Sequence, residues 1–268
     1  MHWFDPPLPP LKIKQGSGKV GTILETKQLT VRFGDHVAVD HVSIQIEEHE
    51  VKSIIGPNGA GKTTFFNLLS GQLKPTHGHV FFKGENITNL PPALRTRKGI
   101  GRSFQITNVF PQLTCFENVR LAVQSKSRVY FNCFSNAKRF KEIEEKAYEW
   151  LELVLLDNKA DELAVHLAHG EKRKLEIAML LALETDLLLL DEPTAGMSLE
   201  EVPKILEVIQ KIKEQRNRTI LLIEHKIDMV LDLSDTIMVL FNGRLLADGK
   251  PKEIIKNEQV QSAYLGGI

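Results

Sequence analysis

The sequence predicts an α/β fold built around a mainly parallel central sheet, and three observations predict it. Residues 187–190 are four consecutive leucines, and Thr219–Ile223 is a second short apolar run. Such runs are typical of parallel strands that are buried on both faces. A helical pattern at Val202–Glu214 lies between them, and strands that alternate with helices indicate α/β units.

A different strand pattern precedes this core. Apolar and polar residues alternate over residues 29–33 and again over residues 42–46. This alternation predicts half-buried strands of an antiparallel layer. Residues 1–21 are rich in Pro and Gly and are expected to form a flexible tail, so the folded domain is expected to span residues 22–268.

The middle of the chain, at about residues 106–170, is expected to form a helical subdomain. Residues 137–155 carry apolar side chains at helical spacing, and a further helix is expected at residues 172–183. Residues 238–247 predict a β-hairpin, because their central Asn242-Gly243 pair favours a type I′ turn.

The composition and the apolar pattern argue against several classes of protein. The 268 residues include 34 basic and 34 acidic side chains, so no global field draws the chain toward nucleic acid. Two cysteines do not suggest a disulfide scaffold and fit a reducing compartment. No apolar stretch is long enough to span a bilayer and no secretory signal is visible, so any membrane role is expected to be peripheral.

Residues 56–63 match the phosphate-loop pattern of Gly, four residues, Gly-Lys and Ser or Thr. The glycines let backbone N–H groups turn toward a phosphate, and the helix expected at Lys62–Ser70 directs its positive N-terminus there. Lys62 is expected to lie between the β- and γ-phosphates, and Thr63 to ligate Mg²⁺. Gly71 is placed to end the helix. The expected nucleotide-binding residues are Gly56, Pro57, Asn58, Gly59, Ala60, Gly61, Lys62 and Thr63.

The leucine run at residues 187–190 ends in Asp191 and Glu192. A buried parallel strand delivers these carboxylates to its carboxyl end, where ligands bind in such sheets. Asp191 is expected to hold Mg²⁺ through water, and Glu192 to act as general base for the attacking water. An apolar strand that ends in Asp-Glu is by itself weak evidence for a nucleotide-hydrolysing site. It is strong evidence when a phosphate loop precedes it in the chain.

Three further positions have both a functional and a structural interpretation. His225 follows the second apolar strand, where a lone histidine is usually structural. Gln105 precedes the helical segment, and its side-chain oxygen could touch Mg²⁺ or water. Gly170 in residues 167–171 permits a close backbone approach before a helix, and the plain alternative is a helix-capping turn.

These elements, in this order, resemble the ATP-binding cassette (ABC) family over nearly all of the chain beyond the tail. Gln105 matches the family's Q-loop, Asp191 and Glu192 its Walker B and catalytic glutamate, and His225 its switch histidine. Phe33 matches the aromatic residue that stacks on adenine, and Thr64 extends the phosphate loop. The match to the family's signature, whose role is to contact ATP on a partner cassette, consists of Leu167, Ala168, His169, Gly170 and Glu171.

Within that family, residues 99–105, 109–114, 117–119 and 263–266 are similar to the ATPases of branched-chain amino acid transporters. Residues 169–172 and 195–197 also resemble the urea and neutral amino acid branches. Two positions depart from the family pattern. Ala168 replaces the signature serine and lacks a hydroxyl for the γ-phosphate. Ser198 stands where many cassettes carry the aspartate of the D-loop. This replacement argues against a salt bridge from the D-loop across a dimer.

The resemblance implies a P-loop NTPase with a RecA-like core, an antiparallel β subdomain and a helical subdomain. It implies a peripheral subunit at the cytoplasmic face of the membrane, which binds ATP and Mg²⁺ and hydrolyses ATP to energise an importer of branched-chain or neutral amino acids. The implied partners are a second ABC ATPase (a paralogue is favoured over a second copy), two transmembrane permease subunits and, indirectly, a solute-binding protein.

Other functions stay open at this stage. A urea importer and a lipid or lipopolysaccharide exporter use similar ATPases. A soluble ABC ATPase acting on nucleic acid is disfavoured by the zero net charge and the single set of motifs. A stand-alone P-loop switch, in which the altered signature is a decoy, is disfavoured by the complete motif order.

Overall fold

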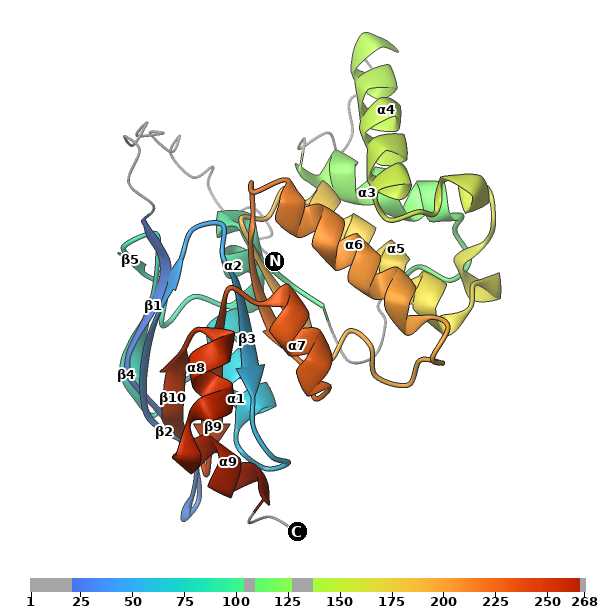
Figure 1. Cartoon of the computed structure of the whole chain (residues 1–268). Helices are drawn as coiled ribbons and strands as arrows, with labels where there is room; N and C mark the ends of the chain where they lie inside the picture. The colour runs from blue at the N-terminus through green and yellow to red at the C-terminus, as the bar shows by residue number, and fades with distance from the viewer. Residues whose placement is uncertain (1–20, 104–108, 127–136, 266–268) are drawn as a thin grey trace, which may run out of the picture.

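The computed structural model describes residues 21–103, 109–126 and 137–265, with two sheets and surrounding helices (Figure 1). The expected tail lies almost entirely outside these residues. Within the described ranges, no helix combines the length and the apolar character that crossing a membrane requires.

The central sheet has six strands in the order β10-β9-β3-β8-β7-β6. Four of its pairings are parallel, and β10 joins β9 in an antiparallel pair, so the expectation of a mainly parallel sheet is confirmed. The strand that leads into the phosphate loop, at residues 51–55, and the two apolar runs lie in the middle of this sheet. The strands are β3 (Val51–Ile55), β6 (Ile100–Arg102), β7 (Leu187–Asp191), β8 (Thr219–Ile223), β9 (Thr236–Phe241) and β10 (Arg244–Gly249).

The second sheet is antiparallel in every pairing and has the order β2-β1-β4-β5. Its two long strands, β1 (Thr22–Phe33) and β2 (His36–Glu47), contain the alternating segments and confirm the expected antiparallel layer. The sequence pattern did not predict β4 (His77–Phe82) or the very short β5 (Glu85–Asn86). In Figure 1 this sheet and helices α3 and α4 lie at opposite sides of the molecule.

Most of the expected helices are found, with shifted ends. Helices α1 and α6 have the expected bounds, whereas α4 ends at Leu153 and α5 begins at His169 instead of residue 172. The predicted start of α5 was wrong, because Ala168, which has an extended backbone conformation, is already the N-cap of the helix. The helices are α1 (Lys62–Ser70), α2 (Pro92–Lys98), α3 (Cys115–Lys126), α4 (Ala137–Leu153), α5 (His169–Ala182), α6 (Val202–Glu214), α7 (Ile227–Leu233), α8 (Pro251–Lys256) and α9 (Glu258–Leu265).

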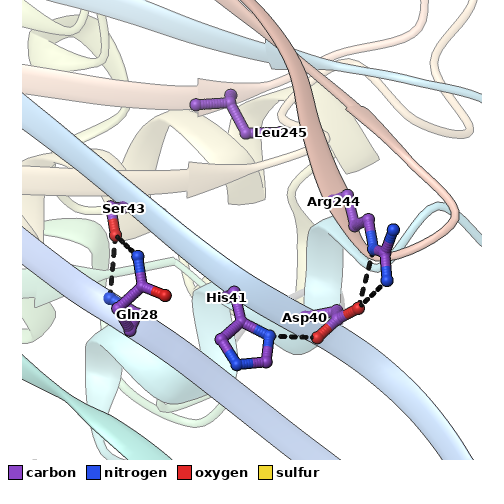
Figure 2. Close-up of a pocket in the computed structure, with 6 residues that line it drawn as sticks. All are labelled: Gln28, Asp40, His41, Ser43, Arg244 and Leu245. Carbon is purple, nitrogen blue, oxygen red and sulfur yellow. Dashed lines mark hydrogen bonds and ion pairs between the residues drawn. The ribbon is translucent and has the colours of Figure 1, made fainter.

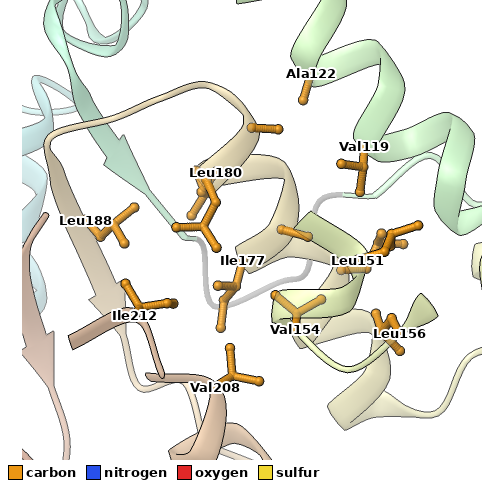
Figure 3. Packing of buried hydrophobic residues seen from close by; sticks show 14 of the residues in the cluster. Val119, Ala122, Leu151, Val154, Leu156, Ile177, Leu180, Leu188, Val208 and Ile212 are labelled. Atoms are coloured by element: carbon orange, nitrogen blue, oxygen red, sulfur yellow. The ribbon is translucent and has the colours of Figure 1, made fainter. Parts of the chain in front are cut away.

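Strand β7 separates two hydrophobic clusters because successive side chains of a strand point to opposite faces. Leu188 and Leu190 pack with helices α3 to α6, and Figure 3 shows this side, with Leu188 facing Leu180 and Ile212. Leu187 and Leu189 pack on the other side with α1 and the antiparallel sheet. All four leucines are fully buried, as a central parallel strand requires.

The hairpin between β9 and β10 turns at Asn242 and Gly243, whose φ angles are 49° and 77°. Positive φ at both central residues is the property of a type I′ turn, so the expected turn is confirmed. The hairpin also supports the phosphate loop, since the N–H of Gly243 donates to the carbonyl of Ala60 at 3.1 Å.

Candidate functional site

The phosphate loop joins β3 to α1 and is packed tightly against two neighbouring strands. A Cβ atom on Gly56 would lie 2.2 Å from the carbonyl oxygen of Leu240, and one on Gly61 would lie 2.4 Å from that of Ala38. Gly61 also has a φ of 95°, which is unfavourable for any residue with a side chain. The close approach of these two carbonyl groups therefore requires glycine at both positions.

Lys62 and Thr63 open helix α1, whose N-terminus follows the loop directly. The Lys62 ammonium is buried and donates to the carbonyl oxygens of Gly56 at 2.8 Å and Pro57 at 3.0 Å. Burial lowers the pKa of Lys62, and the nearby carboxylates of Glu192 and Asp191 oppose that shift. The Lys62 ammonium is thus held within the phosphate loop, on the side that faces the carboxylates of Asp191 and Glu192.

Asp191 ends β7 inside the protein, with no exposed surface. Its Oδ2 accepts a hydrogen bond from Arg102 Nη2 at 3.1 Å, and its N–H donates to Ser103 Oγ at 3.2 Å. Its Oδ1 is buried without a hydrogen-bond partner. Burial raises the pKa of Asp191, and Arg102 opposes the shift. A buried carboxylate oxygen with spare acceptor capacity is unusual, and a carboxylate oxygen of this kind is a suitable ligand for a hydrated Mg²⁺.

Arg102 was not identified from the sequence as a site residue. Its Nη1 donates to Asn67 Oδ1 at 2.6 Å and to Ser70 Oγ at 2.7 Å, so it connects helix α1 to Asp191. No sequence signal marks Arg102, because the strand that it ends has only three residues and its partner Asp191 is distant in the chain.

Glu192 and His225 lie at the carboxyl ends of the neighbouring strands β7 and β8. His225 Nε2 lies 2.8 Å from Glu192 Oε1, and both side chains keep partial exposure to solvent. Glu192 has a φ of 47°, and its N–H donates to the carbonyl of Ile223. The structure therefore brings together the expected general base and the expected switch histidine.

A second buried carboxylate, which the sequence reasoning also missed, supports this pair. Glu224 Oε1 accepts from the Thr194 N–H at 3.0 Å and from its hydroxyl at 2.7 Å. Its Oε2 accepts from the N–H of His225 at 3.1 Å. Glu224 thus ties the segment after Glu192 to the backbone of His225. A glutamate between an apolar strand and a histidine was its only sequence signal.

Residues 167–171 form the entry to helix α5. The Ala168 N–H donates to Glu171 Oε2 at 3.0 Å, and Glu171 pairs with Lys159 at 2.9 Å. The alanine side chain has no oxygen that could accept the N–H of Glu171, so one of the two hydrogen bonds of a capping box is missing. The expected close approach at Gly170 is present, because a Cβ there would lie 2.9 Å from Glu201 Oε1. In the described contacts, no hydrogen bond joins this segment to the phosphate loop.

Two expected nucleotide contacts stand apart from these interactions. Phe33 ends β1 and is 49% exposed, so its ring is available to a planar ligand, but no described contact ties it to the loop. Gln105 lies outside the described residues.

A surface pocket of about 450 Å³ lies elsewhere, on the antiparallel sheet and the β10 strand (Figure 2). Its polar side chains satisfy one another: Asp40 pairs with Arg244 and His41, and Gln28 bonds to Ser43. No residue of the phosphate loop lines it, so it is not the expected nucleotide site.

The family model for ABC transporters matches residues 39–195, and a model for branched-chain amino acid ATP-binding cassette transporters matches residues 244–267. The chain is 41% identical over 249 residues to the high-affinity branched-chain amino acid transport ATP-binding protein BraF of Pseudomonas aeruginosa, covering 91% of this chain and 98% of BraF.

Solved structures agree with these sequence matches. The ADP conformation of MJ1267, an ATP-binding cassette of an ABC transporter, has a TM-score of 0.78 and 31% identity, covering 92% of this chain and 99% of that one. The ATP-binding cassette MJ0796, in a dimeric post-hydrolysis state with ADP and Pi, has a TM-score of 0.70 and 28% identity, covering 85% and 99%.

Proposed function

This chain belongs to the ABC transporter family as an ATP-binding, ATP-hydrolysing subunit, and we propose that it drives the uptake of branched-chain or neutral amino acids. The observation that carries hydrolysis is the 2.8 Å contact between Glu192 and His225 beside the phosphate loop. The solute class is supported by the relatives and by the matched segment at residues 244–267.

In this proposal the phosphate loop binds the β- and γ-phosphates through its backbone N–H groups and Lys62. Thr63 and Asp191 would hold Mg²⁺, which supplies positive charge to offset that of the phosphates. Glu192 orients and deprotonates the attacking water, since its carboxylate is partly exposed next to the loop. His225 fixes the orientation of Glu192 and contacts the γ-phosphate.

We place the chain at the cytoplasmic face of the membrane as a peripheral subunit. Its partners would be a second ABC ATPase, either a paralogue or another copy, and two permease subunits that receive solute from a solute-binding protein. Each ATP would lie between a phosphate loop and the residues 167–171 of the opposite subunit. Gln105 and the helical subdomain at about residues 106–170 would transmit the ATP state to the permeases.

The test compares wild-type chain with Glu192→Gln, alone and co-expressed with its neighbouring transporter subunits. We expect turnover to fall roughly 10²–10⁴-fold while binding of a fluorescent ATP analogue is unchanged, because the amide keeps the size of the side chain but is not a base. Glu200→Gln is the matched control, because Glu200 is an exposed glutamate outside the expected site residues. Equal steady-state hydrolysis by Glu192→Gln and wild type in the assembled complex would contradict the assignment.

A further inference from the structure

The side chain of Glu201 connects two loops that are far apart in the sequence. Its Oε1 accepts the N–H of Gly170 at 3.0 Å, at the start of helix α5. Its Oε2 accepts the N–H of Ser198 at 3.1 Å, and the Ser198 hydroxyl accepts the Glu201 N–H at 3.3 Å. The two oxygens of one carboxylate are therefore divided between two segments.

The bond to Ser198 has a local explanation, because reciprocal bonds between a serine and the glutamate three residues later form a capping box. The bond to Gly170 does not, since α6 needs no contact with α5 to be capped. That bond depends on glycine, because a Cβ at position 170 would lie 2.9 Å from the carboxylate oxygen. The backbone N–H bonds lower the pKa of Glu201, so the carboxylate is ionised at neutral pH.

A second approach joins the same two segments. A Cβ on Gly196 would lie 3.8 Å from the imidazole Nε2 of His169, so this turn also lies against the first residue of α5. Leu199, which lies between Gly196 and Glu201 in the chain, is 86% exposed. The turn at residues 196–198 and the turn at residues 168–171 therefore form one continuous edge with an exposed apolar side chain on it.

We propose that Glu201 is a positioning residue that holds residues 168–171 and residues 196–198 as one rigid face for the partner cassette. This inference rests on the proposed function, in which residues 167–171 meet ATP bound by the opposite subunit. The carboxylate fixes the α5 N-terminus relative to the turn, so both segments reach the partner without a separate ordering cost. The hydrogen bond that the Gly170 N–H donates to Glu201 also limits how far the turn at residues 168–171 moves, because Ala168 offers no side-chain oxygen.

Two substitutions separate this role from simple helix capping. Glu201→Gln keeps one acceptor oxygen and can hold only one of the two N–H groups, whereas Glu201→Ala holds neither. Because Gln is an accepted capping-box residue, we expect it to retain the Ser198 bond and to release Gly170. Glu200→Ala is the matched control, since Glu200 is exposed and adjacent.

The first readout is amide hydrogen exchange on the full chain, which does not require ATP. In Glu201→Gln, we expect faster exchange in the peptide that contains Gly170, with little change at Ser198. In Glu201→Ala, both peptides should exchange faster. Unchanged protection at Gly170 in both variants would overturn the proposal, whatever the chain's activity.

The second readout is steady-state ATP hydrolysis by the complex assembled with its transporter subunits. We expect Glu201→Gln to raise the KM for ATP about tenfold, the effect of losing one hydrogen bond to a charged group, with kcat changed far less. An unchanged KM would overturn the positioning role. A lower KM would also overturn it, because it would show that the Glu201 carboxylate competes with the nucleotide. If the complex with native Glu201 does not hydrolyse ATP, the proposed function fails, and hydrogen exchange still decides whether Glu201 links the two loops.

Discussion

His225 Nε2 and Glu192 Oε1 lie 2.8 Å apart although 33 positions separate the two residues in the chain. The contact is possible because the adjacent parallel strands β7 and β8 end at the same edge of the sheet. A general base whose position is fixed by a second side chain acts as a unit with it, so their contributions to turnover are not independent.

This coupling predicts a non-additive double-mutant cycle. His225→Ala should lower kcat about 10²–10³-fold, and Glu192→Gln with His225→Ala should be little slower than the slower single variant. Single-turnover hydrolysis in the assembled transporter measures the chemical step. Strictly additive losses would show that the two residues act separately, and His225→Gln, which keeps a hydrogen-bonding group, should lie between wild type and alanine.

Removing the buried carboxylate of Glu224 should lower the free energy of unfolding and the rate of ATP hydrolysis. Glu224→Ala leaves the Thr194 N–H and hydroxyl and the His225 N–H without their acceptor. We expect a loss of about 2–4 kcal/mol in the free energy of unfolding, measured with urea. Glu214→Ala is the control, because its side chain makes an exposed bond to Gln210 and should matter by about 0.5 kcal/mol or less. Equal effects of the two variants would rule out a special role for Glu224.

Gly59 and Gly61 offer a matched pair for the packing of the phosphate loop. Both have positive φ, but a Cβ on Gly59 meets nothing within 4 Å, whereas one on Gly61 meets the Ala38 carbonyl at 2.4 Å. Gly59→Ala should cost about 1–3 kcal/mol from backbone strain alone. Gly61→Ala should cost about 2–6 kcal/mol, because overpacking adds to the strain. Thermal unfolding gives the comparison, and a reversed order would contradict the close approach to Ala38.

Cys115 should react slowly with thiol reagents. It is fully buried, and burial raises the pKa of its thiol to about 11. Only the thiolate reacts, so at pH 8 about 0.1% of this thiol is reactive, against roughly a quarter of an ordinary cysteine. In a Cys133→Ser background, we expect alkylation at least about 10²-fold slower than for free cysteine. The rate should rise about tenfold per pH unit below pH 11, and rapid labelling at pH 8 would contradict this.

The elements predicted from the sequence are those whose pattern is continuous along the chain. Strands β7 and β8 each combine an apolar run with a clear end, the phosphate loop has a fixed spacing of Gly, Lys and Thr, and the structure contains both strands. Strands β5 and β6 have two and three residues, too few for any alternation to be recognised. Ends were less accurate, because Glu171 caps the N–H of Ala168 and α5 therefore starts earlier than its apolar pattern suggests.

The supporting side chains could not be predicted, because their partners are distant in sequence. Arg102 meets Asp191 across 89 positions, and Glu224 meets Thr194 across 30. A buried charge identifies its partner only after the strand order is known. Gly170 was correctly expected to allow a close approach, but the group that approaches it, the Glu201 carboxylate, follows from the tertiary fold alone.

The uniform composition of β7 has a consequence for how the chain folds. Because residues 187–190 are all leucine, a strand that slipped by one position would still present leucine to each cluster, and packing alone would hardly oppose the slip. What distinguishes the correct alignment is the polar end, where Asp191 meets Arg102 and the hydroxyl of Ser103. The residues that would serve ATP therefore also fix the register of the central strand during folding.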